Sequence, residues 1–350
     1  MEEFVRWSEQ EVIGWLGAAG LLAGRSVDST ASMSHRATAM LVTLEDGSAL
    51  FFKKPRDDRR EGEVLSMMRR ELAGLGDLMP SLVHHDPASN IAVTASLGDR
   101  RSMRDISGWV PPGDGPLVRR VAEGLARLHV ESRSALGGRA GPCPAHATNP
   151  VPTFGRITPS DFASAPGARF PEFLGVVQEI DETLRSLRSS WEADCLVHGD
   201  FKDDNVMVGG SAEEPSVTFV DWEMAGWGDP LWDVGTMVGM FLYYWAQSVR
   251  RGGGRDLASL VRDAAVPFAL VRSSSAAFAS TYARAAGLTR VRDRLAKVVR
   301  FAGVFLLHRV KATLEVLGTF PPEAWNCLQV GKTLVADPAV GARIVLGEAA

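Results

Sequence analysis

The sequence has few cysteines and no hydrophobic run long enough to cross a membrane. Its cysteines are Cys143, Cys195 and Cys327. They are widely spaced and form no CxxC pair, which disfavours a zinc site or a disulfide framework. The longest apolar run, Val234 to Ala246, is shorter than the roughly 20 residues of a membrane helix. Because Glu2 and Glu3 stand where a signal peptide would be basic, we expect a cytoplasmic protein without a membrane partner.

Nothing in the composition excludes a large folded core. The chain has 350 residues, of which 45% are hydrophobic, and its net charge is -4. These values fit one globular enzyme of two lobes.

The chemistry is concentrated in residues 195–233. This segment reads CLVHGDFKDDNVMVGGSAEEPSVTFVDWEMAGWGDPLWD, and it places His198, Asp200 and Asn205 in the spacing HxDxxxxN. That spacing is typical of a kinase catalytic loop. Two short apolar runs around a glycine-containing turn then predict a hairpin that ends at Asp221. The hairpin would return a second carboxylate beside the first.

Phosphoryl transfer to a hydroxyl requires these residue types. One carboxylate must lie near the acceptor oxygen, and separate oxygen ligands must hold the magnesium ion that bridges the nucleotide phosphates. Asp200 suits the first task. Asn205 and Asp221 suit the second, because an amide and a carboxylate can bind a hard cation and still leave positions for phosphate and water. His198 is interpreted as a support of the loop.

The segments HGDFKDDN and VDWEMAGWGDPLWD resemble the catalytic loop and metal-binding motif of the aminoglycoside phosphotransferase and choline kinase family. The resemblance implies an α+β, two-lobed, protein-kinase-like fold with a small antiparallel β lobe and a larger, mainly helical lobe. It also implies ATP and Mg²⁺ as cofactors, Asp200 as catalytic base, and Asn205 and Asp221 as metal ligands. Asp233 would brace the catalytic loop from the next helix. We place the nucleotide-binding lobe at residues 1–98 and the catalytic, acceptor-binding lobe at residues 99–350.

The small lobe contains a strong hairpin signal. Strands are predicted over residues 39–44 and 49–54, with the turn Glu-Asp-Gly-Ser between them. The period of two places Phe51 and Lys53 on one face, so Lys53 is the predicted phosphate-contacting lysine, with Lys54 as the solvated alternative. Glu63, in a helix predicted over residues 59–75, would pair with Lys53, and Glu61 competes for this role.

The loop expected to cover the nucleotide phosphates lacks glycine. Residues 29–37 read STASMSHRA. Side chains would therefore have to assist the backbone amides, and Ser32, Ser34 and His35 are the candidates. A surface histidine is an equally plausible interpretation of His35.

The remaining chain is mainly helical by pattern. Apolar spacing predicts helices over residues 8–20, 117–130, 172–190, 241–250, 256–281 and 291–317, with a further segment after residue 322. Residues 91–95 read as a strand at the hinge between the lobes. Residues 134–171 are rich in Gly, Pro and Ala and predict a long loop, which would lie beside the acceptor or act as an inert linker.

Acidic residues are scarce in the last third. Residues 234–350 hold 15 basic and 7 acidic residues, whereas residues 1–233 hold 23 and 35. A basic region opposes polycationic acceptors such as aminoglycosides. The alternative is that these arginines form a solvated helix face. No recognition motif accompanies the charge, so we expect no nucleic-acid partner.

A narrower resemblance concerns the acceptor. FKDDN together with VDWEMAGWGDPLWD is similar to the phosphotransferases of bacterial peptide-tailoring pathways, including class V lanthipeptide and thioamitide biosynthesis. It implies phosphorylation of Ser or Thr in a ribosomal precursor peptide, with a possible partner lyase. The alternatives are a small-molecule kinase that acts on an antibiotic, a sugar or an amino alcohol, and a pseudokinase that binds a partner without transfer. All residues of the catalytic type are present, which argues against the pseudokinase.

Overall fold

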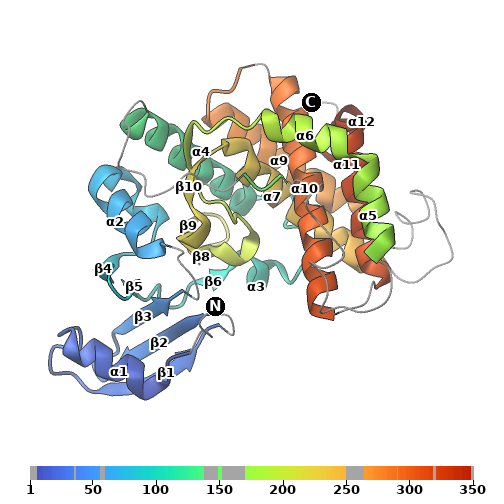
Figure 1. The fold of residues 1–350 in the computed structure, drawn as a ribbon. Helices are drawn as coiled ribbons and strands as arrows, with labels where there is room; N and C mark the ends of the chain where they lie inside the picture. The colour runs from blue at the N-terminus through green and yellow to red at the C-terminus, as the bar shows by residue number, and fades with distance from the viewer. Residues whose placement is uncertain are drawn as a thin grey trace.

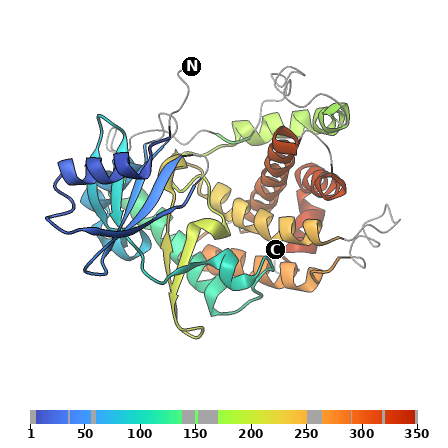
Figure 2. The same cartoon turned by 90° about the horizontal axis from the view of Figure 1, so that it is seen from below.

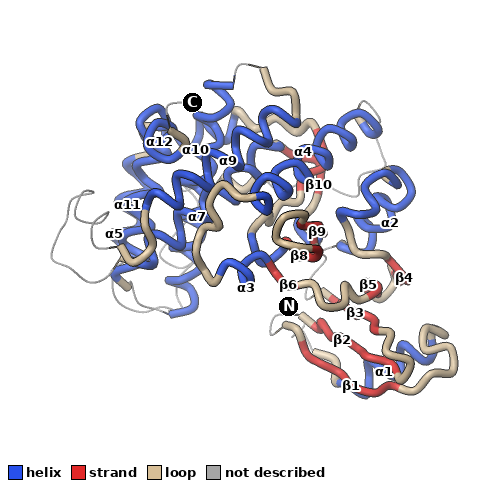
Figure 3. Tube along the Cα trace, turned by 180° about the vertical axis from the view of Figure 1, so that it is seen from behind, coloured by secondary structure: helices blue, strands red, loops and turns tan. Residues whose placement is uncertain are grey.

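Strands gather in a small lobe and helices in a larger one (Figures 1 and 3). The computed structural model describes residues 6–34, 37–55, 60–137, 149–151, 170–249, 264–289, 291–317 and 321–347. The predicted α+β arrangement, with a small antiparallel β lobe and a larger helical lobe, is confirmed. None of the helices in these ranges is long and apolar enough to cross a membrane.

The small lobe is built on a five-stranded antiparallel sheet of order β1-β2-β3-β5-β4. Its strands are β1 (Val27–Ser32), β2 (Thr38–Leu44), β3 (Ala49–Lys54), β4 (Leu82–Asp86) and β5 (Ile91–Ala95). The β2–β3 hairpin pairs Thr43 with Ala49, so the predicted hairpin is confirmed. Helix α1 (Glu9–Ala18) begins at the Ser8 capping box and lies across the sheet in Figure 2.

The two faces of β3 have different surroundings. Phe52 is fully buried in a cluster with Val12 and Leu16 of α1. Because successive side chains alternate between faces, Lys53 points the opposite way, toward the large lobe. Burial of the apolar face against α1 therefore fixes the direction of Lys53.

The helix predicted over residues 59–75 is shorter than expected. Helix α2 (Glu61–Glu71) ends at Leu72, and the 3-10 helix η1 (Ala73–Leu78) follows. Gly74 and Gly76 lie within η1, and glycine has low helix propensity. The chain then returns to the sheet as β4.

The chain crosses between the lobes over residues 96–100. The sheet ends with β5, and β6 (Arg101–Ser102) already pairs with β8 (Val206–Gly210) of the large lobe. Strand β8 forms a hairpin with β9 (Pro215–Phe219), as the sequence predicted. Short strands β7 (Cys195–Val197) and β10 (Gly226–Gly228) also pair. These strands frame the segment that carries the motifs.

The large lobe consists mainly of helices (Figures 1 and 2). They are α3 (Met103–Ser107), α4 (Pro116–Leu136), α5 (Phe170–Glu179), α6 (Asp181–Ser189), α7 (Pro230–Ser248), α9 (Phe268–Ala285), α10 (Val291–Leu317), α11 (Pro322–Ala336) and α12 (Pro338–Val345). The helix predicted over residues 172–190 is two helices, because Ile180 leaves helical geometry. Helix α4 extends to Leu136, and most of the loop predicted over residues 134–171 lies outside the described residues.

Helix α7 is buried along almost its whole length and packs closely on α10. A Cβ atom added at Gly235 would lie 2.5 Å from the Cβ of Phe301, and one at Gly239 would lie 2.7 Å from Cδ1 of Phe305. These two glycines therefore permit the close approach. The first turns of α7 are thereby held rigidly beneath the catalytic loop.

Candidate active site

The first turns of α7 anchor the catalytic loop, residues 198–205. The carboxylate of Asp233 is fully buried and accepts hydrogen bonds from the backbone N–H groups of His198 at 2.7 Å and Gly199 at 3.0 Å. Trp232 Nε1 donates to the Gly199 carbonyl at 2.8 Å, and Thr236 Oγ1 donates to the Phe201 carbonyl at 2.8 Å. The bracing position that the resemblance implied for Asp233 is thus observed.

Gly199 lets the loop pass close to the metal-binding motif. Its φ angle is +83°, a left-handed conformation that glycine adopts without strain. A Cβ atom there would lie 2.3 Å from the backbone oxygen of Met224. A side chain at this position would push the two functional segments apart.

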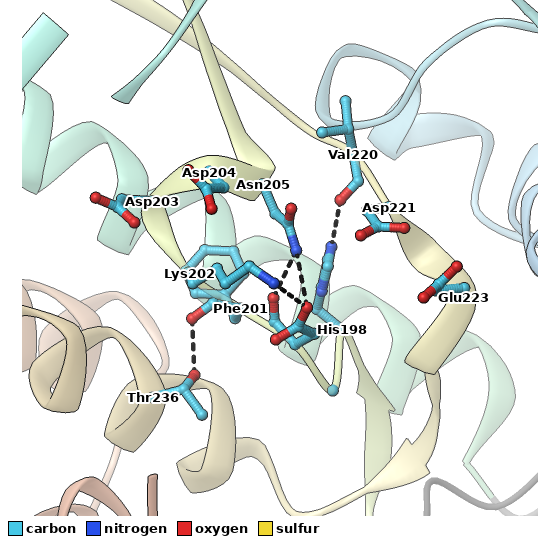
Figure 4. Close-up of polar contacts among 12 residues, drawn as sticks. His198, Phe201, Lys202, Asp203, Asp204, Asn205, Val220, Asp221, Glu223 and Thr236 are labelled. Carbon is cyan, nitrogen blue, oxygen red and sulfur yellow. Dashed lines mark hydrogen bonds and ion pairs between the residues drawn. The ribbon is translucent and has the colours of Figure 1, made fainter. Parts of the chain in front are cut away.

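His198 supports the loop from inside. It is fully buried, its Nε2 atom donates to the Val220 carbonyl at 2.9 Å, and its ring lies 4.8 Å from that of Trp222. These contacts join the catalytic loop to the end of the β8–β9 hairpin (Figure 4). His198 is therefore placed as a positioning residue.

Asp200 is held by two neighbours in its own loop. Asn205 Nδ2 donates to the Asp200 backbone oxygen at 2.8 Å and to its Oδ2 atom at 3.3 Å. Lys202 Nζ forms an ion pair with the same Oδ2 atom. The Asp200 side chain remains 35% exposed. It is oriented by the loop and still open to a substrate, as a general base requires.

Asp221 lies at the end of the hairpin in a left-handed conformation, with φ +67°. Figure 4 shows Asp221 and Glu223 on the opposite side of His198 from Asp203 and Asp204. Asp221 forms an ion pair with Lys53 of the small lobe. The metal-binding motif and the nucleotide lobe therefore meet at this carboxylate.

Lys53 is surrounded by negative charge. Besides Asp221, its Nζ atom lies 2.7 Å from Glu61 and 3.1 Å from Glu223. Burial acts to lower the pKa of Lys53, but the three carboxylates raise it well above its usual value. Burial likewise acts to raise the pKa of Asp221, and the adjacent ammonium more than offsets this, so that pKa is lowered. Both groups are charged at neutral pH.

Of the two candidate glutamates in α2, Glu61 pairs with Lys53, so the prediction of Glu63 is wrong. Glu61 is buried, and its Oε1 atom also accepts a hydrogen bond from the Trp222 N–H at 3.1 Å. Glu63 instead pairs with Arg60 at 3.2 Å. Each residue turns a helix by about 100°, so residues two apart point to nearly opposite faces. Glu61 therefore faces Lys53 and Trp222, while Glu63 faces Arg60.

Lys54, Ser32 and Ser34 contact groups other than Lys53. Lys54 donates to the Ser89 carbonyl at 2.9 Å, on the far face of β3. Ser32 accepts a hydrogen bond from Arg6, and Ser34 accepts one from the Ala37 N–H at 3.3 Å. His35 lies outside the described residues. Phosphate contacts by Ser32, Ser34 and His35 stay predictions.

The oxygen ligands present fit a magnesium ion. The Asn205 amide nitrogen is committed to Asp200, which leaves its carbonyl oxygen as the donor atom beside the Asp221 carboxylate. In the described ranges no three His, Cys, Asp or Glu side chains form a metal cluster. A site of two protein ligands completed by phosphate and water suits Mg²⁺. One ammonium among three carboxylates also leaves a net negative charge that a divalent cation would neutralise.

Two further residues of this site were not predicted from the sequence. Lys202 follows Asp200 by two positions and neutralises its carboxylate. Glu223 follows Asp221 by two positions and contacts Lys53. Both residues lie inside the two motif segments. Their position two residues after Asp200 and Asp221 is the feature of the sequence that could have identified them.

This fold and this arrangement of residues define a phosphotransferase. Residues 34–298, about three quarters of the chain, match the phosphotransferase enzyme family APH, and the chain belongs to that family. No curated protein matches the sequence.

Solved structures show the same fold. A choline/ethanolamine kinase family protein from Mesorhizobium loti has a TM-score of 0.58 at 18% identity, over 97% of this chain and 99% of that one. Amicoumacin kinase hAmiN, solved with AMP-PNP, Ca²⁺ and Ami, has a TM-score of 0.58 at 14% identity, over 95% and 94% of the two chains. A thermostable mutant of aminoglycoside phosphotransferase APH(4)-Ia has a TM-score of 0.54 at 15% identity, over 95% and 99%.

Glu61→Gln is expected to impair phosphate transfer far more than Glu63→Gln. The first change removes one of the charges that orient Lys53, whereas the second alters only a partly exposed pair with Arg60. We expect the Glu61 variant to raise the KM for nucleotide by about tenfold and the Glu63 variant to stay within about twofold of wild type. Steady-state kinetics at saturating acceptor measure both. An equal effect of the two changes would contradict the assignment.

Proposed function

We propose that this protein transfers the γ-phosphoryl group of ATP to an acceptor hydroxyl in a Mg²⁺-dependent reaction. The observation that carries the proposal is the placement of Asp200. Its carboxylate is oriented by Asn205 and partly exposed, while Lys53 and Asp221 pair on the neighbouring side. The neighbouring amicoumacin kinase, solved with an ATP analogue and a divalent cation, supports the choice of cofactors.

Each residue of the site has a separate role in the proposed reaction. Asp200 accepts the proton of the acceptor hydroxyl as that oxygen attacks the γ-phosphorus, and the bond from phosphorus to the β–γ bridging oxygen breaks to release ADP. Lys53, held by Glu61, contacts the nucleotide phosphates. Asn205 and Asp221 would hold Mg²⁺, which supplies neutralisation of phosphate charge. Lys202 lies beside Asp200, where it would stabilise negative charge on the transferred group.

The favoured acceptor is Ser or Thr of a ribosomal precursor peptide, with a partner lyase acting afterwards. The support is the likeness of FKDDN and VDWEMAGWGDPLWD to peptide-tailoring enzymes and the basic character of residues 234–350. Acidic groups on a peptide would be attracted to such a region.

A small-molecule acceptor is the second candidate, and the pairing of cations in the large lobe favours it. Several basic side chains of residues 264–347 already contact carboxylates. These pairs are Lys297–Asp229, Arg294–Glu192, Lys332–Glu179 and Lys311–Glu315. The carboxylates neutralise these cations locally. The net positive charge of residues 234–350 is therefore a weaker argument against cationic acceptors. Structures of similar fold are also named for choline/ethanolamine kinase, amicoumacin kinase and aminoglycoside phosphotransferase.

The test is direct phosphorylation of two acceptor panels. The protein is incubated with ATP and Mg²⁺, separately with Ser/Thr-rich precursor peptides and with aminoglycosides, and phosphate incorporation is followed by mass. We expect transfer to peptides, and we expect it to weaken as salt rises, because exposed charges are screened over about 8 to 10 Å. Efficient transfer to an aminoglycoside with none to any peptide would overturn the peptide proposal. Absence of any Mg²⁺-dependent ATP turnover, including hydrolysis, would overturn the phosphotransfer proposal.

A further inference from the structure

An exposed tryptophan stands beside the catalytic loop in a strained conformation. Trp109 is 56% exposed, and its φ angle is +66°. It directly follows Gly108, which ends α3 and has φ +64°. A bulky residue at positive φ is unfavourable, and such strain persists where the surroundings enforce it, commonly at functional sites.

Arg104 fixes the ring of Trp109. The guanidinium carbon of Arg104 lies 4.5 Å from the centroid of the Trp109 ring. The Tyr244 ring meets Trp109 edge-on at 5.8 Å, and the Tyr244 hydroxyl accepts a hydrogen bond from Arg104 Nε at 3.1 Å. One face of Trp109 is therefore occupied, while more than half of the side chain stays open to solvent.

The same arginine joins Trp109 to the catalytic loop. Arg104 Nη2 lies 3.2 Å from Asp203 Oδ1 and 2.5 Å from Asp204 Oδ2. These aspartates directly precede Asn205, which contacts Asp200. Figure 4 shows them on the side of the loop away from Asp221 and Glu223. Arg104 thus connects Trp109 to the part of the catalytic loop that carries Asp203 and Asp204, away from Asp221 and Glu223.

The charges around Trp109 disfavour a cationic ligand. A cation could bind either a free carboxylate or an electron-rich ring face. Asp203 is buried and bonded to Arg104 and Tyr244, and Asp204 is paired with Arg104. The Arg104 guanidinium lies against one face of the Trp109 ring, so its positive charge opposes a second cation on the open face.

We propose that Trp109, stacked on Arg104, binds the acceptor through a neutral planar or apolar group next to the reacting hydroxyl. This inference rests on the proposed phosphotransfer to a hydroxyl and specifies its acceptor. An aromatic ring or a peptide plane can stack on the open face of Trp109, because offset stacking requires no charge on the ligand. Acceptors with a cationic group in that position bind more weakly.

Two matched blocked dipeptides test the proposal: N-acetyl-Phe-Ser-amide and N-acetyl-Lys-Ser-amide. Binding of each is measured by calorimetry with Mg²⁺ and a non-hydrolysable ATP analogue present. We expect the phenylalanine peptide to bind about 3- to 10-fold more tightly. Trp109→Ala should remove this preference and Trp109→Phe should retain most of it. The control Trp325→Ala changes another exposed tryptophan, on α11, and should retain the preference.

Several results would overturn this inference. They are equal or tighter binding of the lysine peptide, binding of neither peptide at millimolar concentration, or an unchanged preference in Trp109→Ala. Nucleotide binding is measured on the same samples. Failure of the wild-type protein to bind nucleotide with Mg²⁺ would contradict the proposed function. The difference in affinity between the two peptides tests the role of Trp109 independently.

Discussion

Replacing Asp200 with asparagine is expected to lower phosphate transfer by about 10²- to 10⁴-fold, the usual cost of losing a positioned general base. Asparagine has nearly the same shape but does not accept a proton from the acceptor hydroxyl. The loop should keep its position, because its anchors are the contacts of Asp233, Trp232 and Thr236 with its backbone. Single-turnover transfer with saturating ATP and Mg²⁺ measures the loss.

Folding and nucleotide binding serve as controls for this variant. The Asp200 side chain is partly exposed, so its neutral replacement should leave the melting temperature and the affinity for ATP close to wild type. Glu214→Gln, in the exposed turn of the β8–β9 hairpin, is a matched removal of one surface carboxylate and should transfer phosphate normally. Wild-type transfer by the Asp200 variant would show that another group takes the proton.

Local patterns predicted the elements that carry these residues. The β2–β3 hairpin has an acidic-glycine turn between two alternating runs, and its register follows from burial of Phe52 against α1. Burial on one face also explains why Lys53, and not Lys54, reaches Asp221. The motif residues His198, Asp200 and Asn205 lie within one short loop, so their spacing could be read from the sequence, although the contacts of Asp233 and Gly199 that hold this loop join it to segments 25 to 35 residues away.

The wrong and missing assignments depend on contacts between distant segments. The choice between Glu61 and Glu63 is decided by which face of α2 meets Lys53 and Trp222, and Trp222 lies on a segment far from α2 in the chain. The stack of Trp109 on Arg104 joins α3 to Tyr244 of α7, far away in the chain, and no local pattern indicates it.

Loss of Asp221 is expected to weaken Mg²⁺-dependent nucleotide binding more than loss of Asn205. A carboxylate opposes the charge of the ion, whereas an amide supplies only a dipole. Asp221→Asn is the appropriate change, because asparagine tolerates the left-handed conformation at φ +67° and alanine would add strain. Removing a partner of a metal ligand typically costs about 10- to 100-fold in affinity, so removing the carboxylate ligand itself should cost at least as much. Titration with Mg²⁺ at a fixed concentration of a nucleotide analogue measures it.

The comparison with Asn205→Ala separates charge from loop geometry. Asn205 also donates hydrogen bonds to Asp200, so its loss should reduce the transfer rate as well as metal affinity. Asp221 makes its observed ion pair with Lys53, which must be rearranged or shared when the ion binds. The Asp221 variant should therefore lose its dependence on Mg²⁺ while retaining some metal-free nucleotide binding through Lys53, which still has Glu61 and Glu223 as partners. Equal losses of Mg²⁺ affinity in the two variants would contradict the prediction that Asp221 contributes more to Mg²⁺ binding than Asn205.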